Sequence, residues 1–89
     1  AYTDSAVSAR QVYSGLKNSM VNATKEERAA ANEQIIETAF MQYTNTILDS
    51  LDAPEHVDQI TYQQAVEDRL REDERGRIEK YLRSKHLLF

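Results

Sequence analysis

The sequence predicts an all-α protein, and three observations lead to that class. The 89-residue chain contains only two Gly and one Pro, whereas a β-rich fold needs many tight turns. Apolar residues return at spacings of three and four along most of the chain, which is the period of an amphipathic helix. They make up 40% of the residues, enough for one modest core and too many for a disordered segment. We therefore expect residues 1–89 to form a single all-helical domain.

The first expected helix covers residues 4–22. Thr3 and Asp4 place side-chain oxygens where they cap the free backbone N–H groups of a first turn. One apolar stripe follows, formed by Ala6, Ala9, Val12, Tyr13, Leu16 and Met20. The stripe predicts that this helix packs against the next one in the chain.

The second expected helix, residues 24–53, is the longest and organises the fold. Thr24 and Glu27 have the spacing of a capping box, in which each side chain accepts a hydrogen bond from the other's backbone N–H. Pro54 ends the helix because its ring clashes with a continuing helical chain. The expected structural core consists of this helix's apolar face and one residue of the first helix: Leu16, Ile36, Phe40, Tyr43, Ile47 and Leu51.

The third expected helix covers residues 61–86. Thr61 and Gln64 suggest a second capping box at its start. The charged stretch 71–77 then interrupts the apolar positions and offers ion pairs at i,i+4 spacing. This pattern is typical of a solvated rod that extends past the core. The expected architecture is a small three-helix bundle, or a helical hairpin, with an extended and partly solvated third helix.

The composition argues against several kinds of chemistry. Cysteine is absent, which excludes a thiolate nucleophile and a Cys-ligated zinc. The two histidines, His56 and His86, have no partner at the spacing that places two metal ligands on one helical face. There is no Gly-rich phosphate loop and no Gly-flanked nucleophilic serine. We therefore expect no enzymatic activity, no bound metal and no cofactor.

The third helix and the apolar C-terminus are the expected partner-binding surface. Five Tyr against two Phe is a composition typical of interfaces, because the tyrosine ring is apolar and its tip is polar. An apolar block follows the charged stretch and exceeds what a small core is expected to cover. The expected partner-binding residues are Arg75, Arg77, Tyr81, Leu82, Arg83, Leu87, Leu88 and Phe89. The alternative is that residues 87–89 fold back onto the first two helices.

These features predict a small non-enzymatic protein–protein interaction module. It would be an adaptor, an inhibitor or regulator, or a subunit of a homo- or hetero-oligomeric assembly. The alternative is a nucleic-acid-associated regulator that uses the Arg-rich end of the third helix. Interleaved acidic residues and a net charge of −4 disfavour that alternative, because a phosphate track attracts cations and repels carboxylates. The lack of a long apolar run, a visible signal peptide and cysteine leads us to expect no membrane contact and a cytoplasmic location.

Overall fold

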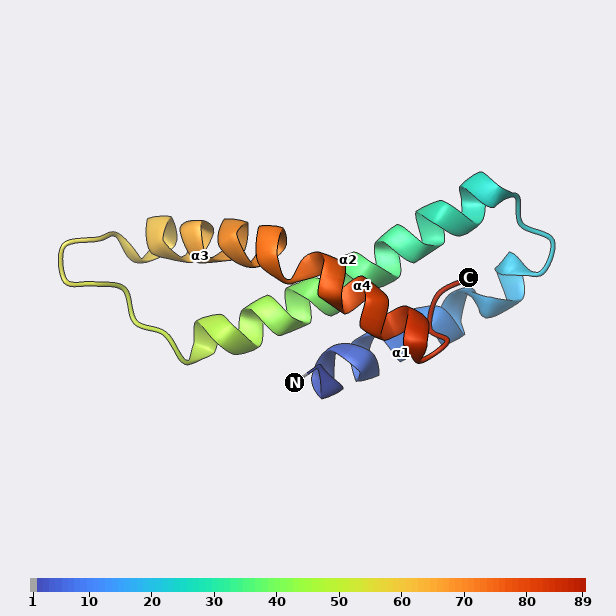
Figure 1. Cartoon of the computed structure of the whole chain (residues 1–89), viewed down its shortest axis with the longest axis horizontal. Coiled ribbons are helices and arrows are strands. Elements are labelled where there is room, and N and C mark those ends of the chain that lie inside the picture. Colours follow the sequence, from blue (N-terminus) through green and yellow to red (C-terminus); the bar gives the residue numbers. More distant parts are fainter. Residues whose placement is uncertain (1) are drawn as a thin grey trace.

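A computed structural model describes residues 2–89. Within that range the chain is all-helical, as the sequence predicts, with four α-helices, one short 3₁₀ helix and no strand. The elements in order are α1 (Thr3–Leu16), the 3₁₀ helix η1 (Lys17–Met20), α2 (Lys25–Asp49), α3 (Gln59–Asp73) and α4 (Arg75–Ser84). The molecule is elongated, with extents of 53 × 23 × 19 Å, and α2 runs along most of its length (Figure 1). Because the described residues form four α-helices, the expected three-helix bundle is not confirmed.

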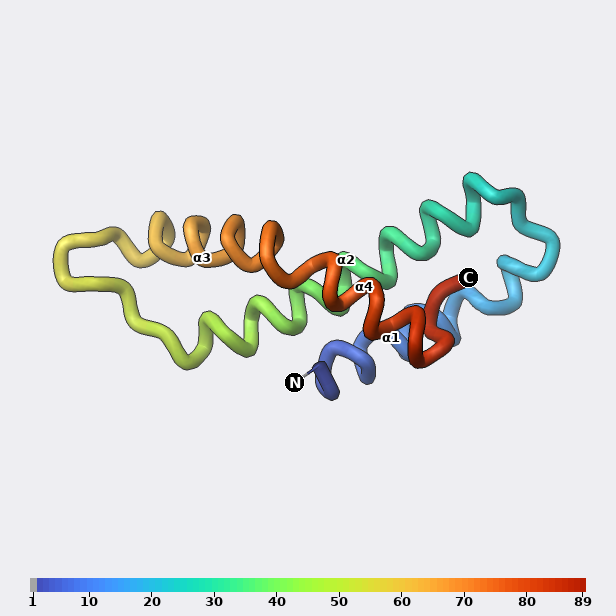
Figure 2. Tube along the Cα trace, in the orientation of Figure 1, coloured from blue at the N-terminus to red at the C-terminus, as the bar shows by residue number. Residues whose placement is uncertain are grey.

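The core occupies one half of this elongated molecule. α1 runs back beside the first part of α2, and α4 crosses α2 and ends near α1 (Figure 2). Ala9 of α1 and Ala39 of α2 are both fully buried in the core. Because their side chains are small, the two helices can approach closely. The buried cluster comprises Ala9, Ile35, Ile36, Ala39, Phe40, Ile78, Leu82 and Leu87. α3 contributes no buried residue to it.

Of the expected core residues, only some lie in this cluster. Ile36 and Phe40 are buried, and Tyr43 packs against the cluster while remaining partly exposed. Leu16, Ile47 and Leu51 are half-buried and lie outside it. The physical reason is that α1 and α4 cover α2 only as far as Thr44, which is the last buried residue of that helix.

The boundaries of the first two helices differ from the expected ones. Thr3 and Asp4 do not cap α1 as expected: the helix begins at Thr3, and its N-cap Tyr2 makes no side-chain capping hydrogen bond. α1 ends at Leu16, and residues 17–20 tighten into η1. The capping box of α2 is present as predicted: Thr24 Oγ1 accepts from the Glu27 N–H at 3.1 Å, and Glu27 Oε1 accepts from the Thr24 N–H at 3.0 Å. α2 stops at Asp49, because the backbone leaves the helical conformation at Ser50, where φ is −101° and ψ is 3°. Pro54 lies beyond the end of α2 and is not the residue that ends the helix, contrary to the expectation.

The expected third helix is two helices. The helix is interrupted at Glu74, where the backbone is distorted to φ −115° and ψ −27°. α3 runs beside the second part of α2, and α4 turns its buried face toward the core (Figure 1). The expected capping box at Thr61 is wrong. Asp58 is the N-cap of α3, and its Oδ2 accepts from the Thr61 N–H at 3.0 Å. A carboxylate is well suited to this position because the helix dipole attracts negative charge.

The chain after α4 folds back onto the molecule. His86 adopts a left-handed conformation, with φ 59°, and the Leu87 N–H donates to the Leu82 carbonyl at 3.0 Å. This arrangement is a Schellman motif, and it turns Leu87 into the core beside Leu82. Phe89 then stacks on Tyr13 with ring centroids 4.5 Å apart.

His86→Gly is expected to stabilise the protein by about 0.5–1 kcal/mol. A side chain in the left-handed region is strained, and Gly removes that strain at the end of α4. Urea denaturation followed by circular dichroism measures the effect. His86→Ala keeps the Cβ atom and is the control, and equal stabilisation by both variants would contradict a conformational cause.

Candidate functional site

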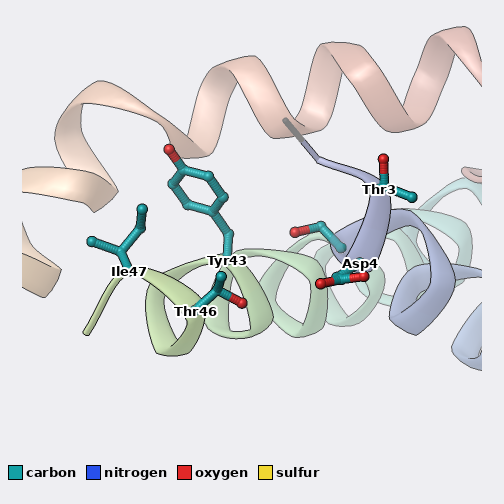
Figure 3. A pocket seen from close by; sticks show the side chains of 6 residues that line it. Thr3, Asp4, Tyr43, Thr46 and Ile47 are labelled. Carbon is teal, nitrogen blue, oxygen red and sulfur yellow. The ribbon is translucent and has the colours of Figure 1, made fainter. Parts of the chain in front are cut away.

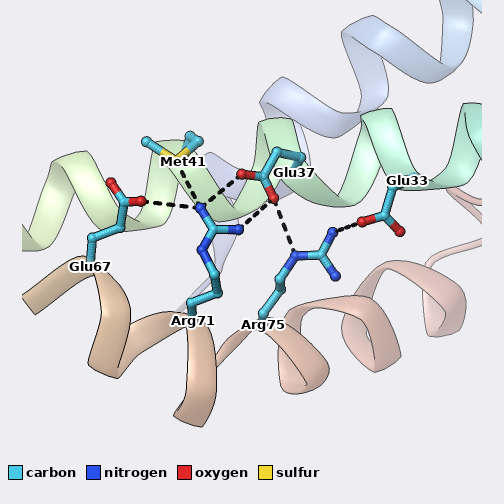
Figure 4. A network of polar contacts seen from close by, with 6 residues as sticks. All are labelled: Glu33, Glu37, Met41, Glu67, Arg71 and Arg75. Carbon is cyan, nitrogen blue, oxygen red and sulfur yellow. Dashed lines mark hydrogen bonds and ion pairs between the residues drawn. The ribbon is translucent and has the colours of Figure 1, made fainter. Parts of the chain in front are cut away.

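A network of ion pairs joins α2 to α3 and α4 (Figure 4). Arg71 donates two parallel hydrogen bonds to Glu37, at 2.9 and 3.0 Å, and a third to Glu67 at 3.2 Å. Arg75 donates from Nε to Glu37 at 3.2 Å and from Nη2 to Glu33. Glu33 and Glu37 are one helical turn apart on α2, as Arg71 and Arg75 are along the facing chain. Two arginines therefore face two glutamates of opposite charge, and these ion pairs orient α3 and α4 against α2.

The network favours the charged forms of Glu37 and Arg71. The hydrogen bond from Arg71 is the main cause that lowers the pKa of Glu37, the bond from Arg75 adds to it, and partial burial opposes both. The hydrogen bonds that Arg71 donates to Glu37 and to Glu67 raise the pKa of Arg71. Because the Arg71 and Glu37 side chains are 38% and 40% exposed, water screens their attraction. The network therefore contributes more to the placement of the helices than to the overall free energy of folding.

Acid is expected to weaken this network. The pKa of Glu37 is lower in the folded chain, so its stabilisation is fully present above the unfolded value of about 4.3 and is lost as the pH falls through the folded value. Glu37→Gln should flatten the decrease in the free energy of unfolding between about pH 5 and pH 3. Urea titrations across this range measure the slope. Glu55→Gln, at an exposed position of the connector, is the control, and an equal flattening there would contradict the assignment.

The arginines that suggested nucleic-acid binding are engaged within the chain. Besides Arg71 and Arg75, Arg69 pairs with Asp73 at 2.7 Å, Arg77 with Glu74 at 3.1 Å and Arg83 with Glu79 at 3.3 Å. A phosphate would have to compete with these carboxylates for each guanidinium group. No specific contact in the described part of the chain favours the nucleic-acid alternative.

The expected partner-binding residues at the end of the chain mostly face inward. Leu82 and Leu87 are 0% and 4% exposed in the protein's own core. Leu88 and Phe89 pack against that core and remain partly exposed. Asn32 holds the tail by its backbone, accepting from the Phe89 N–H at 2.6 Å and donating to the Phe89 carbonyl at 3.0 Å. The structure thus adopts the alternative in which residues 87–89 fold back.

Tyr81 belongs to an aromatic cluster rather than to a free surface. The Tyr2 ring lies 5.4 Å from that of Tyr81 and 5.3 Å from that of Tyr43. The Tyr2 hydroxyl donates to the Glu74 carboxylate at 2.5 Å, and this bond, helped by partial burial, raises the pKa of Tyr2 to about 12. The cluster ties the start of α1 to the point where α3 ends and α4 begins. Packing within the protein therefore explains why these three tyrosines lie together.

One small open cavity lies between the start of α1 and α2 (Figure 3). Its volume is about 210 Å³, and its lining consists of Thr3, Asp4, Ser5, Tyr43, Thr46 and Ile47. These side chains offer hydroxyl groups and a single carboxylate in the first turn of α1. They provide neither a nucleophile with an adjacent base nor a set of convergent charges, so the cavity does not resemble a catalytic site.

The largest uncovered region is the part of the molecule beyond Thr44. We call residues 45–73 the distal arm: the end of α2, the connector and α3. No residue from 45 to 77 is buried, although the arm contains many large apolar side chains. Val57 and Ile60 are 42% and 75% exposed. The other apolar side chains of the arm are half-buried, namely Ile47, Leu48, Leu51, Tyr62, Val66 and Leu70.

The distal arm also differs from the rest of the chain in charge. It contains eight acidic residues and two arginines, a net charge of −6, whereas the remainder contains seven acidic and nine basic residues, a net charge of +2. No Lys or Arg occurs between Arg28 and Arg69. The arm is therefore an acidic and partly apolar extension of a slightly basic body.

Two further observations concern metals and membranes. Among residues 2–89, no three His, Cys, Asp or Glu side chains lie close enough together to hold a metal ion. No helix in the same range combines the length and the apolar character that crossing a bilayer requires.

Comparisons of the chain with protein-family models, with curated proteins and with solved structures find no match.

Proposed function

We propose that this protein is a small non-enzymatic protein–protein interaction module whose contact surface is the distal arm. The observation that carries the proposal is the absence of any buried residue from 45 to 77, in a segment that includes a complete 15-residue helix. Such a module acts as an adaptor, as a regulator or as a subunit of a larger assembly. The sequence-based expectation was an interaction protein that binds through the third helix and the apolar C-terminus. The proposal keeps the interaction protein and places its surface on the distal arm, which contains the first part of that expected helix.

Energetics support this choice of surface. A helix of 15 residues is marginally stable by itself in water, and helices in proteins gain most of their stability by packing an apolar face. α3 packs that face only partly against α2, which leaves Ile60 75% exposed. Full burial of such a side chain contributes about 1.5–3 kcal/mol. A partner that covers the arm would therefore gain binding energy and stabilise α3 together.

The apolar residues at the end of the chain, Leu82 and residues 87–89, are the weaker candidate for the contact surface. Leu82 and Leu87 are already buried within the chain, and exposing them to a partner would first require opening the core. The arm requires no such rearrangement, because Val57 and Ile60 are exposed in the folded molecule.

Photo-crosslinking tests the proposal. A benzophenone amino acid replaces Ile60 in one variant and Val21 in another, since these residues are 75% and 76% exposed but lie at opposite ends of α2. In cells of the source organism, illumination should produce a discrete protein adduct from position 60 and none from position 21. Nuclease treatment should leave the adduct unchanged. The absence of an adduct from position 60, or the same adducts from both positions, would contradict the arm as the contact surface.

A further inference from the structure

We propose that the occupant of the distal arm is a cationic amphipathic helix of another protein. This inference rests on the proposed function and adds the chemistry of the partner. The helix would lie along α3 and the end of α2, with its apolar face on the uncovered side chains of the arm and its Lys or Arg residues beside the arm's carboxylates. The exposed apolar side chains of the arm support a binding site there. The negative charge of the arm indicates that the bound helix is cationic.

The apolar strip of the arm consists of its two exposed large apolar side chains, Val57 and Ile60, and it lies at the start of a helix of moderate length. α3 contains 15 residues, which corresponds to about 22 Å at the α-helical rise. Ile60 lies in the first turn of α3 and is 75% exposed, whereas Val66 is half-buried and lies about 120° away from Ile60 around the helix. Helices that bind in this way place side chains at i, i+3, i+4 and i+7 on the apolar strip of their partner.

The arm's carboxylates select the charge of the partner. Glu67 and Asp73 pair with arginines of the chain itself. The other six acidic residues of the arm form no ion pair within residues 2–89, namely Asp49, Asp52, Glu55, Asp58, Asp68 and Glu72. Unpaired charges of one sign around an apolar strip speed the encounter with a partner of opposite charge and disfavour one of like charge.

Asp49 supports a role for this charge outside the fold. It is the last residue of α2, and the last turn of that helix contains no basic residue. Because the helix dipole makes the C-terminal end negative, a carboxylate there is unfavourable in the isolated protein. Asp52 lies only three residues beyond. A cationic partner would convert this unfavourable charge into a favourable contact.

The same charges disfavour the other possible occupants. Two copies of the chain that met arm to arm would bring together two surfaces of net charge −6. A nucleic acid or an anionic membrane would be repelled for the same reason. A cationic helix of a different protein is the occupant that satisfies both the apolar strip and the carboxylates.

The test is the binding of a synthetic Leu/Lys amphipathic peptide of about 15 residues to the full chain, measured by fluorescence anisotropy. The expected result is saturable binding at low salt that weakens at least tenfold when ionic strength rises from about 0.05 M to 0.5 M. A Leu/Glu peptide with the same pattern should not bind. Equal binding of the two peptides, or no binding of the Leu/Lys peptide, would overturn the cationic assignment.

Two pairs of matched variants locate the site. Asp49→Asn with Asp52→Asn should weaken binding about five- to tenfold, whereas Glu26→Gln with Glu79→Gln removes the same charge outside the arm and should change it little. Ile60→Ser should weaken binding at least tenfold, whereas Val21→Ser, at an equally exposed position, should not. Equal effects within either pair would overturn the proposed site. Circular dichroism of each variant confirms that it is folded.

The outcomes separate this inference from the proposed function. A crosslinked protein adduct at position 60 without binding of the Leu/Lys peptide would leave the arm as an interaction surface and reject the cationic helix. Light scattering of the free chain examines self-association. A dimer that Ile60→Ser dissociates would assign the strip to a second copy and reject a partner of a different protein.

Discussion

Leu87→Ala is expected to lower the free energy of unfolding by about 2–5 kcal/mol. Leu87 is 4% exposed and belongs to the buried cluster, so that truncation removes apolar contacts and leaves a cavity. Domains of 89 residues typically have a total stability of about 4–13 kcal/mol. The variant should therefore have a much lower urea midpoint, measured by circular dichroism, and should be partly unfolded under mild conditions.

The result distinguishes the two roles that the sequence left open for the end of the chain. If residues 87–89 served only as a surface for a partner, Leu87→Ala would leave the stability of the isolated protein unchanged. Val21→Ala, at a position 76% exposed, provides the comparison and should change the midpoint little. Similar midpoints for the two variants would contradict the folded-back tail.

Phe40→Ala is expected to have the largest effect, a loss of about 3–5 kcal/mol. Phe40 is fully buried, and the Arg71 guanidinium carbon lies 4.6 Å from the centre of its ring. The residue thus joins the core to the ion-pair network that positions α3. Its loss should disturb the arm as well as the core, which hydrogen exchange of the α3 amides measures together with urea denaturation.

Phe40→Leu separates packing from the cation–π contact. Leucine keeps most of the apolar volume and should cost less than alanine, while it removes the ring beneath Arg71. Amide protection in α3 should then decrease relative to that in α1. A uniform decrease in both helices would show that Phe40 acts only through the core.

Local patterns in the sequence predicted much of the secondary structure. The capping box of Thr24 and Glu27 lies where it was expected, since both of its hydrogen bonds join residues three positions apart. The third helix was placed less well. At the break, Glu74 contacts a residue far away in the chain, since it accepts a hydrogen bond from Tyr2, and a local pattern contains no information about such a contact.

The candidate site could be predicted only in part. Glu33 and Glu37 on α2 have the same spacing as Arg71 and Arg75, so their pairing was open to inference from charge alone. The exposure of Ile60 was not, because it depends on which apolar faces the other helices cover. The same uncertainty applied to Leu87, whose burial requires the turn at His86.

The sequence by itself determined the helical class, the capping box of α2 and the acidic character of residues 45–73. These properties follow from composition and from interactions between residues close in the chain. Tertiary structure alone decided that α4 and the tail complete the core and that α3 is covered only in part, with Ile60 left exposed. The reason is that α2 carries more apolar surface than α1 and α4 can cover in a chain of 89 residues, and only packing determines which part of it stays exposed.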